Sequence, residues 1–152
     1  EVKKELSSED AMKSWGAEIG ALLQGGEFIE LIGDIGAGKT TFTKGLALGL
    51  GITDTVQSPT FTISRLYDGR DNLRLAHYDF YRLNDAGIMA EELRETSQEP
   101  STIIAVEWGD IVADVRPEDY LQLRFTSPTE HSREVTVAAH GERSTRLLEK
   151  LS

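Results

Sequence analysis

The segment GDIGAGKT at residues 33–40 constrains this chain more than any other part of its sequence. It fits the pattern G-x-x-x-x-G-K-[ST] at Gly33, Gly38, Lys39 and Thr40. The apolar run EFIELI before it is typical of a buried strand, and TTFTKGLALGLG after it is typical of a helix that ends at a glycine. A strand that turns through glycines into a helix is the context that the pattern requires, so we predict an α/β fold built around this turn.

This pattern is typical of polyphosphate binding. Backbone N–H groups can converge on phosphate oxygens only where no side chain intervenes, and glycines provide that clearance. The helix N-terminus adds partial positive charge, the lysine reaches the β and γ phosphates, and the first threonine can hold a Mg²⁺ ion. The residues expected to bind the phosphates are Gly33, Asp34, Gly36, Ala37, Gly38, Lys39, Thr40 and Thr41.

A candidate metal ligand follows a second apolar run. Residues 102–106, TIIAV, predict a short buried strand, and Glu107 comes directly after it, as the acid of a Walker B element does. Because Mg²⁺ takes oxygen ligands, we expect Glu107 and the Thr40 hydroxyl to act at one magnesium ion. Glutamate is less usual there than aspartate, and many strands end in an acid without any function.

Asp79 is a second candidate acid, within the otherwise apolar and aromatic segment HYDFYRL. Strand alternation directs it toward the expected nucleotide site, where it could orient the attacking water or a metal ligand. The alternative is a structural ion pair with Arg74 or Arg82 across a hairpin. His77, on the same strand face, is expected to be structural.

The spacing of apolar residues and of turn residues predicts further helices and strands. In chain order they are a helix from Ser7 or Ser8 to Gly25-Gly26, a hairpin of Thr60–Tyr67 and Leu73–Leu83 around DGRDN, a helix Asn84–Thr96 capped by Asn84, a short helix at Asp110–Val115, strands YLQLRF and REVTV separated by SPTEHS, and a C-terminal helix. We predict one domain over residues 1–152, a three-layer α/β/α P-loop NTPase-like fold whose mixed central sheet has antiparallel hairpin additions.

Composition excludes several classes of protein. The chain has 152 residues, no cysteine, and 26 acidic against 16 basic residues, which gives a net charge of −10. Without cysteine no disulfide framework is possible, and a reducing, cytoplasmic location is expected. The negative charge repels nucleic acid, so direct binding of DNA or RNA is not expected. No apolar run has the length of a membrane span, so we expect no membrane association.

Four blocks in one order resemble the TsaE family, the small ATPases of bacterial tRNA threonylcarbamoyladenosine (t6A) biosynthesis. They are GDIGAGKTTFTKG, SPTFT from Ser58, HYDFYRL from His77 and VEW from Val106. The resemblance covers most of the chain and is far more specific than a phosphate-binding loop alone. It implies a protein that binds Mg-ATP, hydrolyses it slowly, and serves a partner complex of TsaD and TsaB, with only indirect contact to tRNA.

The resemblance also implies roles for individual residues. Lys39, Glu107 and Asp79 would be catalytic, with Thr40 and Glu107 at the Mg²⁺. The further residues implied at the nucleotide are Thr60 as a sensor of the γ phosphate, Trp108 beside the site, Arg133 over the nucleotide and Ser8 at its border.

Other functions remain open from the sequence. A small-molecule or nucleoside kinase would use the same phosphate loop with a lid of arginines, for which Arg65, Arg70, Arg74 and Arg82 are candidates, although acids are interleaved with them. A nucleotide-dependent interaction switch, in which hydrolysis only resets binding, is a second alternative. A GTPase is disfavoured because the chain has no N-K-x-D tetrapeptide. No arginine finger is evident either, so slow hydrolysis that depends on a partner is expected.

Overall fold

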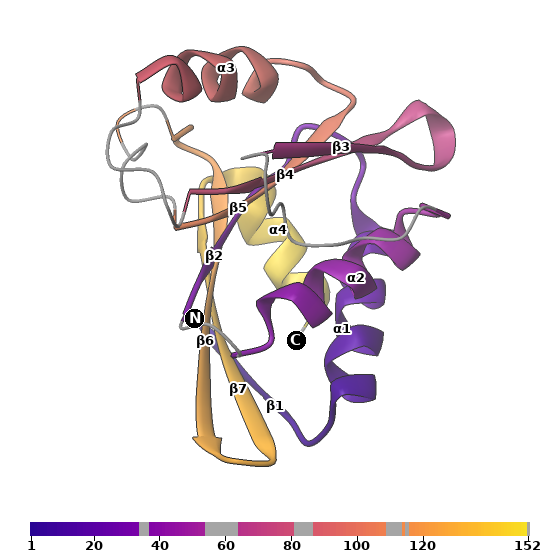
Figure 1. Ribbon diagram of the computed structural model, residues 1–152, viewed down its shortest axis with the longest axis vertical. Coiled ribbons are helices and arrows are strands. Elements are labelled where there is room, and N and C mark those ends of the chain that lie inside the picture. The colour runs from indigo at the N-terminus through magenta and orange to yellow at the C-terminus, as the bar shows by residue number, and fades with distance from the viewer. Residues whose placement is uncertain (34–36, 54–63, 81–86, 109–113, 115, 152) are drawn as a thin grey trace.

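The computed structural model describes residues 1–33, 37–53, 64–80, 87–108, 114 and 116–151. In these residues a seven-stranded sheet has the order β1-β7-β6-β2-β5-β4-β3 (Figure 1). The strands are β1 (Val2–Leu6), β2 (Phe28–Ile32), β3 (Ser64–Asp68), β4 (Arg74–Asp79), β5 (Thr102–Glu107), β6 (Tyr120–Thr129) and β7 (Ser132–His140). The helices are α1 (Glu9–Leu22), α2 (Lys39–Gly49), α3 (Gly87–Ser97) and α4 (Glu142–Leu151), with a 3-10 turn η1 (Arg70–Asn72).

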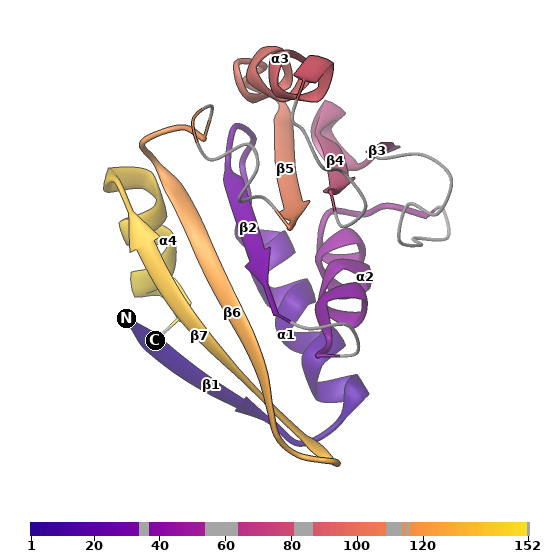
Figure 2. The same cartoon turned by 60° about the vertical axis from the view of Figure 1, so that its left-hand side comes forward.

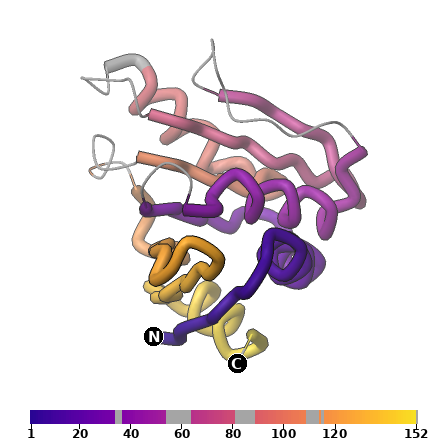
Figure 3. Tube along the Cα trace, turned by 60° about the horizontal axis from the view of Figure 1, so that its bottom comes forward, coloured from indigo at the N-terminus to yellow at the C-terminus, as the bar shows by residue number. Residues whose placement is uncertain are grey.

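The sheet is mixed, as predicted. Its centre is parallel, since β2 pairs with β5 and β6, and β4 pairs with β5 (Figure 2). The outer strands are antiparallel, with β3 on β4, β7 on β6 and β1 on β7. Because β1 lies at the edge beside β7 and α4 follows β7, the two ends of the chain lie close together (Figure 3).

Helices cover both faces of the sheet, so the predicted three-layer α/β/α architecture is confirmed. On one face α1, α2 and α4 enclose the larger core, where Phe42 packs between Trp15 and Phe125 with ring centroids 5.5 and 5.6 Å apart. On the other face α3 packs on β4 and β5 through Leu93 and Tyr78. No helix among the described residues is long and apolar enough to cross a membrane.

Helices α1 and α2 approach each other so closely that their backbones touch. A Cβ atom on Gly45 of α2 would lie 2.1 Å from the carbonyl oxygen of Lys13, and one on Gly20 of α1 would lie 2.3 Å from that of Leu46. Real Cβ atoms do not come this close to backbone atoms. The glycines therefore determine how α2, which begins with Lys39, is seated on α1.

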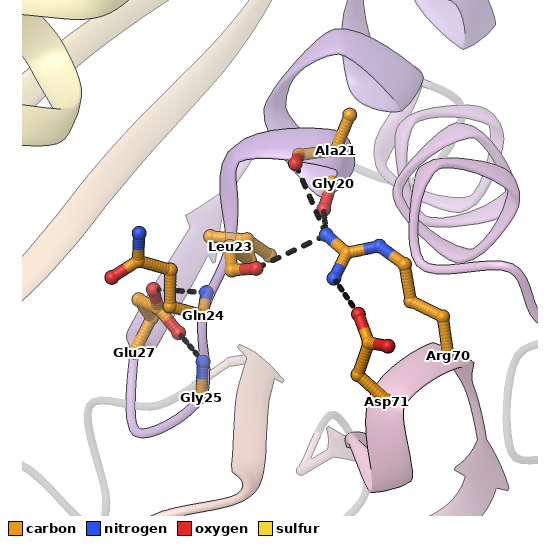
Figure 4. Close-up of polar contacts among 8 residues, drawn as sticks. All are labelled: Gly20, Ala21, Leu23, Gln24, Gly25, Glu27, Arg70 and Asp71. Carbon is orange, nitrogen blue, oxygen red and sulfur yellow. Dashed lines mark hydrogen bonds and ion pairs between the residues drawn. The ribbon is translucent and has the colours of Figure 1, made fainter.

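Arg70 connects the β3–β4 hairpin to the end of α1 (Figure 4). Its Nη2 atom donates hydrogen bonds of 3.0 to 3.1 Å to the carbonyl oxygens of Gly20, Ala21 and Leu23. The last carbonyls of a helix lack partners within the helix, so a cation with several donors stabilises this end. These hydrogen bonds give Arg70 a structural role, so its positive charge need not be explained by a place in a kinase lid.

Most of the predicted elements are confirmed. Helix α1 begins after Ser8, whose hydroxyl accepts a 3.0 Å hydrogen bond from the N–H of Ala11, and β2, α2 and β5 lie where the apolar runs predict them. The hairpin of β3 and β4 is also confirmed within the described residues. The Asn84 cap and nearly all of the helix predicted at Asp110–Val115 lie outside those residues.

Two predictions are wrong. No strand is predicted before α1, yet Val2–Leu6 forms β1, whose middle residues are exposed and charged and therefore carry no apolar signal. The predicted SPTEHS turn is too long, because β6 continues to Thr129 and β7 resumes at Ser132. Pro128 is accommodated by an irregularity in the pairing of these strands between Thr126 and Thr129.

Candidate functional site

Three parallel strands bring the predicted acids to the edge of the sheet where α2 begins. Leu31 near the end of β2 pairs with Glu107 at the end of β5, and Glu107 pairs with Asp79 at the end of β4. Two residues beyond Leu31 the chain reaches Gly33, and Lys39 starts α2. The carboxyl ends of parallel strands are the usual place for a ligand in an α/β sheet. The structure therefore gathers Lys39, Asp79 and Glu107 at such an edge.

The two motif glycines that the structure describes each lie against another element. Gly38, directly before α2, has a φ of 107°, and a Cβ there would lie 2.8 Å from Cε of Met12 in α1. Gly33 has a φ of 154°, and its Cβ would lie 2.8 Å from the carbonyl oxygen of Phe125 in β6. Both positions favour glycine by backbone conformation and by space. Gly38 also brings no side chain to the N-terminus of α2, where N–H groups lack partners within the helix.

Lys39 is buried, and several groups surround its ammonium group. Its Nζ donates a 2.6 Å hydrogen bond to the carbonyl oxygen of Gly33 and lies 3.6 Å from Oε1 of Glu107. It also lies 4.4 Å from the ring centroid of Trp108, at cation–π distance. Trp108 follows Glu107 directly and has a φ of 58°, an uncommon value for a residue with a side chain. Lys39, Glu107 and Trp108, all three predicted site residues, thus lie in contact.

His77, which the sequence predicts to be structural, also belongs to this cluster. Its Nε2 lies 2.7 Å from Oε2 of Glu107, and both side chains are buried. A carboxylate only accepts hydrogen bonds, so Nε2 is the donor. Strand alternation places His77 on the same face of β4 as Asp79, but it does not indicate the contact with Glu107.

Asp79 lies half-buried beside Glu107 in the register of β4 and β5. The alternative of a structural pair with Arg74 is not what the structure shows, because Nε of Arg74 bonds Oδ1 of Asp68 at 3.1 Å. Arg82, the other proposed partner, lies outside the described residues.

The remaining predicted residues are distributed around this cluster. Thr40 and Thr41 lie half-buried in the first turn of α2, and Ala37 is buried beside it. The predicted residues outside the described part of the chain are Asp34, Gly36 and Thr60.

Ser8 and Arg133 lie near each other, where β1 ends and α1 begins, and their recorded contacts are structural. Arg133 pairs with Leu6 of β1, two residues before Ser8 caps α1, and Met12 of the same helix lies against Gly38. The guanidinium of Arg133 donates to carbonyl oxygens of its own hairpin, the shortest bond being 2.9 Å to Ser132. Neither residue contacts Lys39 through a hydrogen bond or ion pair that the structure records.

Known proteins resemble this chain over most of its length. A family model described as threonylcarbamoyl adenosine biosynthesis protein TsaE matches residues 6–135. A tRNA threonylcarbamoyladenosine biosynthesis protein TsaE of Bacillus subtilis is 42% identical over 134 residues, with 87% of this chain and 82% of that protein covered. A protein of the same name from Treponema pallidum is 39% identical, with 87% of this chain and 96% of that protein covered.

A solved structure agrees with these sequence comparisons. The crystal structure of YdiB from Bacillus subtilis superposes with a TM-score of 0.82 and 34% sequence identity. The superposition covers 99% of this chain and 93% of that chain. The mixed sheet and its helices are therefore shared with that protein over nearly the whole length of both.

Proposed function

The chain belongs to the TsaE family of threonylcarbamoyl adenosine biosynthesis proteins, and on that basis we propose that it binds and hydrolyses Mg-ATP in support of tRNA threonylcarbamoylation. Family membership supports the role in t6A biosynthesis. One observation supports the nucleotide chemistry above all others. The ammonium group of Lys39, at the start of α2, lies beside the Glu107 carboxylate, at the edge where Asp79 ends the next strand.

The residues at this edge fit a magnesium-bound polyphosphate. A buried ammonium group and the N-terminus of an 11-residue helix offer positive charge and N–H donors to phosphate oxygens. Mg²⁺ in phosphate sites takes one or two carboxylates and completes its shell with phosphate oxygens and water. Glu107 and the Thr40 hydroxyl are the protein ligands that we propose. Bound Mg-ATP would supply the phosphoryl group that is released to water.

Lys39 changes partners when it binds phosphate. In the structure its ammonium group is held by the Gly33 carbonyl oxygen and by Glu107. A phosphate oxygen is a further acceptor for its three N–H donors, and in the proposal it takes the place of Glu107 beside the ammonium group. Buried charges require such replacement partners, because an unpaired ammonium group in the core is costly.

Glu107 and Asp79 have different roles in the proposal. Glu107 faces Lys39 and is assigned to the metal, whereas Asp79 is assigned to the attacking water, which it would orient by accepting a hydrogen bond. Slow hydrolysis by the isolated chain, and its stimulation by a complex of TsaB and TsaD, are further parts of the proposal. Contact with tRNA would occur through that complex.

The alternative of a small-molecule kinase receives less support than ATP hydrolysis. Of the four arginines that could form its lid, Arg70 is bonded to the end of α1 and Arg74 to Asp68. The alternative of a nucleotide-dependent switch shares the same site. The two differ in one measurement, since a Glu107→Gln variant that binds ATP without hydrolysing it and still supports one round of modification would indicate a switch.

Calorimetry with a matched pair of variants tests the proposed binding site. We expect the wild-type protein to bind ADP and ATP with Mg²⁺, and Lys39→Met to weaken this binding at least about 100-fold, because it removes a charge-assisted contact and leaves Glu107 buried without its cation. Lys44→Met, in the same helix but exposed, is the control and should bind like the wild type. Equal binding by Lys39→Met, or no binding by the wild type with or without TsaB and TsaD, would contradict the proposal.

A further inference from the structure

His77 is a buried polar group that the proposed chemistry leaves without a role. It lies in β4 with none of its surface exposed. Its Nε2 donates to Glu107, whereas its Nδ1 has no hydrogen-bond partner among the described residues. A half-satisfied polar ring in a core is less favourable than an apolar side chain of the same size. Among the described residues, its hydrogen bond to Glu107 is therefore the contact that accounts for a histidine here.

We infer that His77 is a positioning residue that holds the Glu107 carboxylate at the metal site when Lys39 turns to the phosphates, an inference that rests on the proposed function. The two carboxylate oxygens have separate partners, with Lys39 Nζ 3.6 Å from Oε1 and His77 Nε2 2.7 Å from Oε2. In the proposed bound state Lys39 gives up its contact with Glu107 for a phosphate oxygen. His77 lies on the strand beside β5 and can keep its hydrogen bond throughout.

Two other contacts of Glu107 within the described part of the chain do not replace this one. The N–H of Phe80 donates to the backbone carbonyl of Glu107 at 3.0 Å, which fixes the strand but makes no contact with the carboxylate. Asp79, the residue paired with Glu107 in the sheet, carries the same charge and would repel the carboxylate. Among these neighbours only His77 donates to the carboxylate from a position outside the phosphate loop.

Three variants separate the hydrogen bond from the packing of the ring. His77→Gln can place its amide nitrogen close to the position of Nε2 and so keep a donor to Glu107. His77→Asn places its amide nitrogen close to the position of Nδ1, too far from Glu107, and His77→Leu fills the space without any donor. Melting temperatures of the free proteins identify variants that fold.

The first readout needs no nucleotide. In nucleotide-free crystal structures of the three variants in a Lys39→Met background, where the lysine no longer holds Oε1, we expect the Glu107 carboxylate to stay in place with His77→Gln and to move with His77→Asn and His77→Leu. The second readout is the affinity of the ADP complex for Mn²⁺, measured by electron paramagnetic resonance. Loss of a residue that orients a metal ligand commonly weakens metal binding about 10- to 100-fold. We expect that loss in the Asn and Leu variants, rescue in the Gln variant, and unchanged affinity for ADP without metal.

Two results would overturn the inference. One is a Glu107 carboxylate that stays in its wild-type position in the Asn or Leu variant even when Lys39 is replaced by methionine. The other is an Mn²⁺ affinity that does not differ between these variants and His77→Gln. If the wild-type protein bound no ADP, the proposed function would fail, but the position of the carboxylate in the free variants would still decide the role of His77.

Discussion

The Lys39–Glu107 pair is almost fully removed from solvent, with 5% of each side chain exposed. Taking two charges out of water costs more than their attraction returns unless further hydrogen bonds satisfy both groups. The Gly33 carbonyl oxygen does this for Lys39, and His77 does it for Glu107. Lys39, Glu107 and His77 therefore depend on one another, and a substitution at one of them leaves a buried polar group of another without its partner.

The buried phenol of Tyr78 predicts how the free energy of unfolding depends on pH. Its hydroxyl donates a 3.0 Å hydrogen bond to Thr96 in α3, and burial raises the pKa of its phenol above the ordinary value of 10.0. The phenol ionises first in the unfolded chain, so its contribution to stability is complete below about pH 10 and is lost as the pH rises through the raised value. Tyr78→Phe should lower the free energy of unfolding by about 1 kcal/mol at neutral pH, since it loses the hydrogen bond.

Urea denaturation of both proteins between about pH 8 and about pH 11 measures this effect. The advantage of the wild type over Tyr78→Phe should shrink as the pH rises above about 10. A difference that stays constant over this range would show that the phenol does not ionise differently in the folded and unfolded states.

The sequence predicted some of these residues and could not predict others. Lys39 and Glu107 could be predicted because a contiguous motif and a strand end identify them. His77 was expected to be structural, but its contact with Glu107 could not be predicted, because the two lie 30 residues apart and only the register of β4 and β5 brings them together. Ser8 and Arg133 were assigned to the nucleotide from the resemblance alone, and their recorded contacts are structural.

At the level of elements, the contact between α1 and α2 predicts that a substitution which stabilises an isolated helix destabilises this protein. In an isolated helix Gly45→Ala would stabilise by about 1 kcal/mol, because alanine is the better helix former. In this protein the added Cβ would lie 2.1 Å from the Lys13 carbonyl oxygen, and neither backbone can yield easily. We expect a loss of about 3 kcal/mol or more in the free energy of unfolding, measured with urea.

Lys44→Ala, the exposed neighbour in α2, serves as the control and should change stability by no more than about 0.5 kcal/mol. A Gly45→Ala protein as stable as the wild type would mean that the two helices lie further apart than the structure has them.

The Arg70 contact predicts a loss of stability without a loss of ligand binding. Arg70→Met keeps an apolar side chain of similar length and removes all three hydrogen bonds to the end of α1, so we expect a loss of about 1–3 kcal/mol with unchanged ADP affinity. Arg74→Met is the control, because its pair with Asp68 is exposed and is expected to contribute less than about 1 kcal/mol. A specific loss of phosphate transfer in Arg70→Met would instead favour a kinase.

The elements were predictable where apolar spacing is strong, as in α1 and β5. They were not predictable at the edges of the sheet. Strand β1 is held by pairing with β7 rather than by its own side chains, most of which are exposed. Asp119 likewise bonds the N–H groups of Arg143 and Ser144 and so caps α4 from more than 20 residues away. Contacts of this kind depend on tertiary structure and leave no local pattern.

For the whole molecule, the parallel centre and antiparallel additions followed from the alternation of strands and helices, but the strand order did not. Hydrophobic patterning determines which residues are buried and says little about which strand lies beside which. The order matters for function, because β2, β5 and β4 are consecutive neighbours and so align Gly33, Glu107 and Asp79 at one edge.

The net charge of −10 leads to a prediction for the isolated protein. Its field repels the phosphate backbone, so titration of labelled tRNA with the protein alone, followed by fluorescence anisotropy at low salt, should give no saturable binding. Addition of TsaB and TsaD should produce a complex that contains tRNA. Salt-dependent binding by the protein alone would show that a local basic surface outweighs the overall charge.

The glycine contact between α1 and α2 has a consequence for substitutions far from any ligand. Because the two backbones touch and Met12 lies against Gly38, the first helix acts as a template against which the lysine-bearing helix is set. A bulkier residue at Gly16 or Gly20 would act as a wedge that pushes α2 away from α1. Lys39, at the start of α2, would then tilt away from Glu107. Such a variant would resemble a binding-site mutant in every ligand assay, although the altered residue faces only the neighbouring helix.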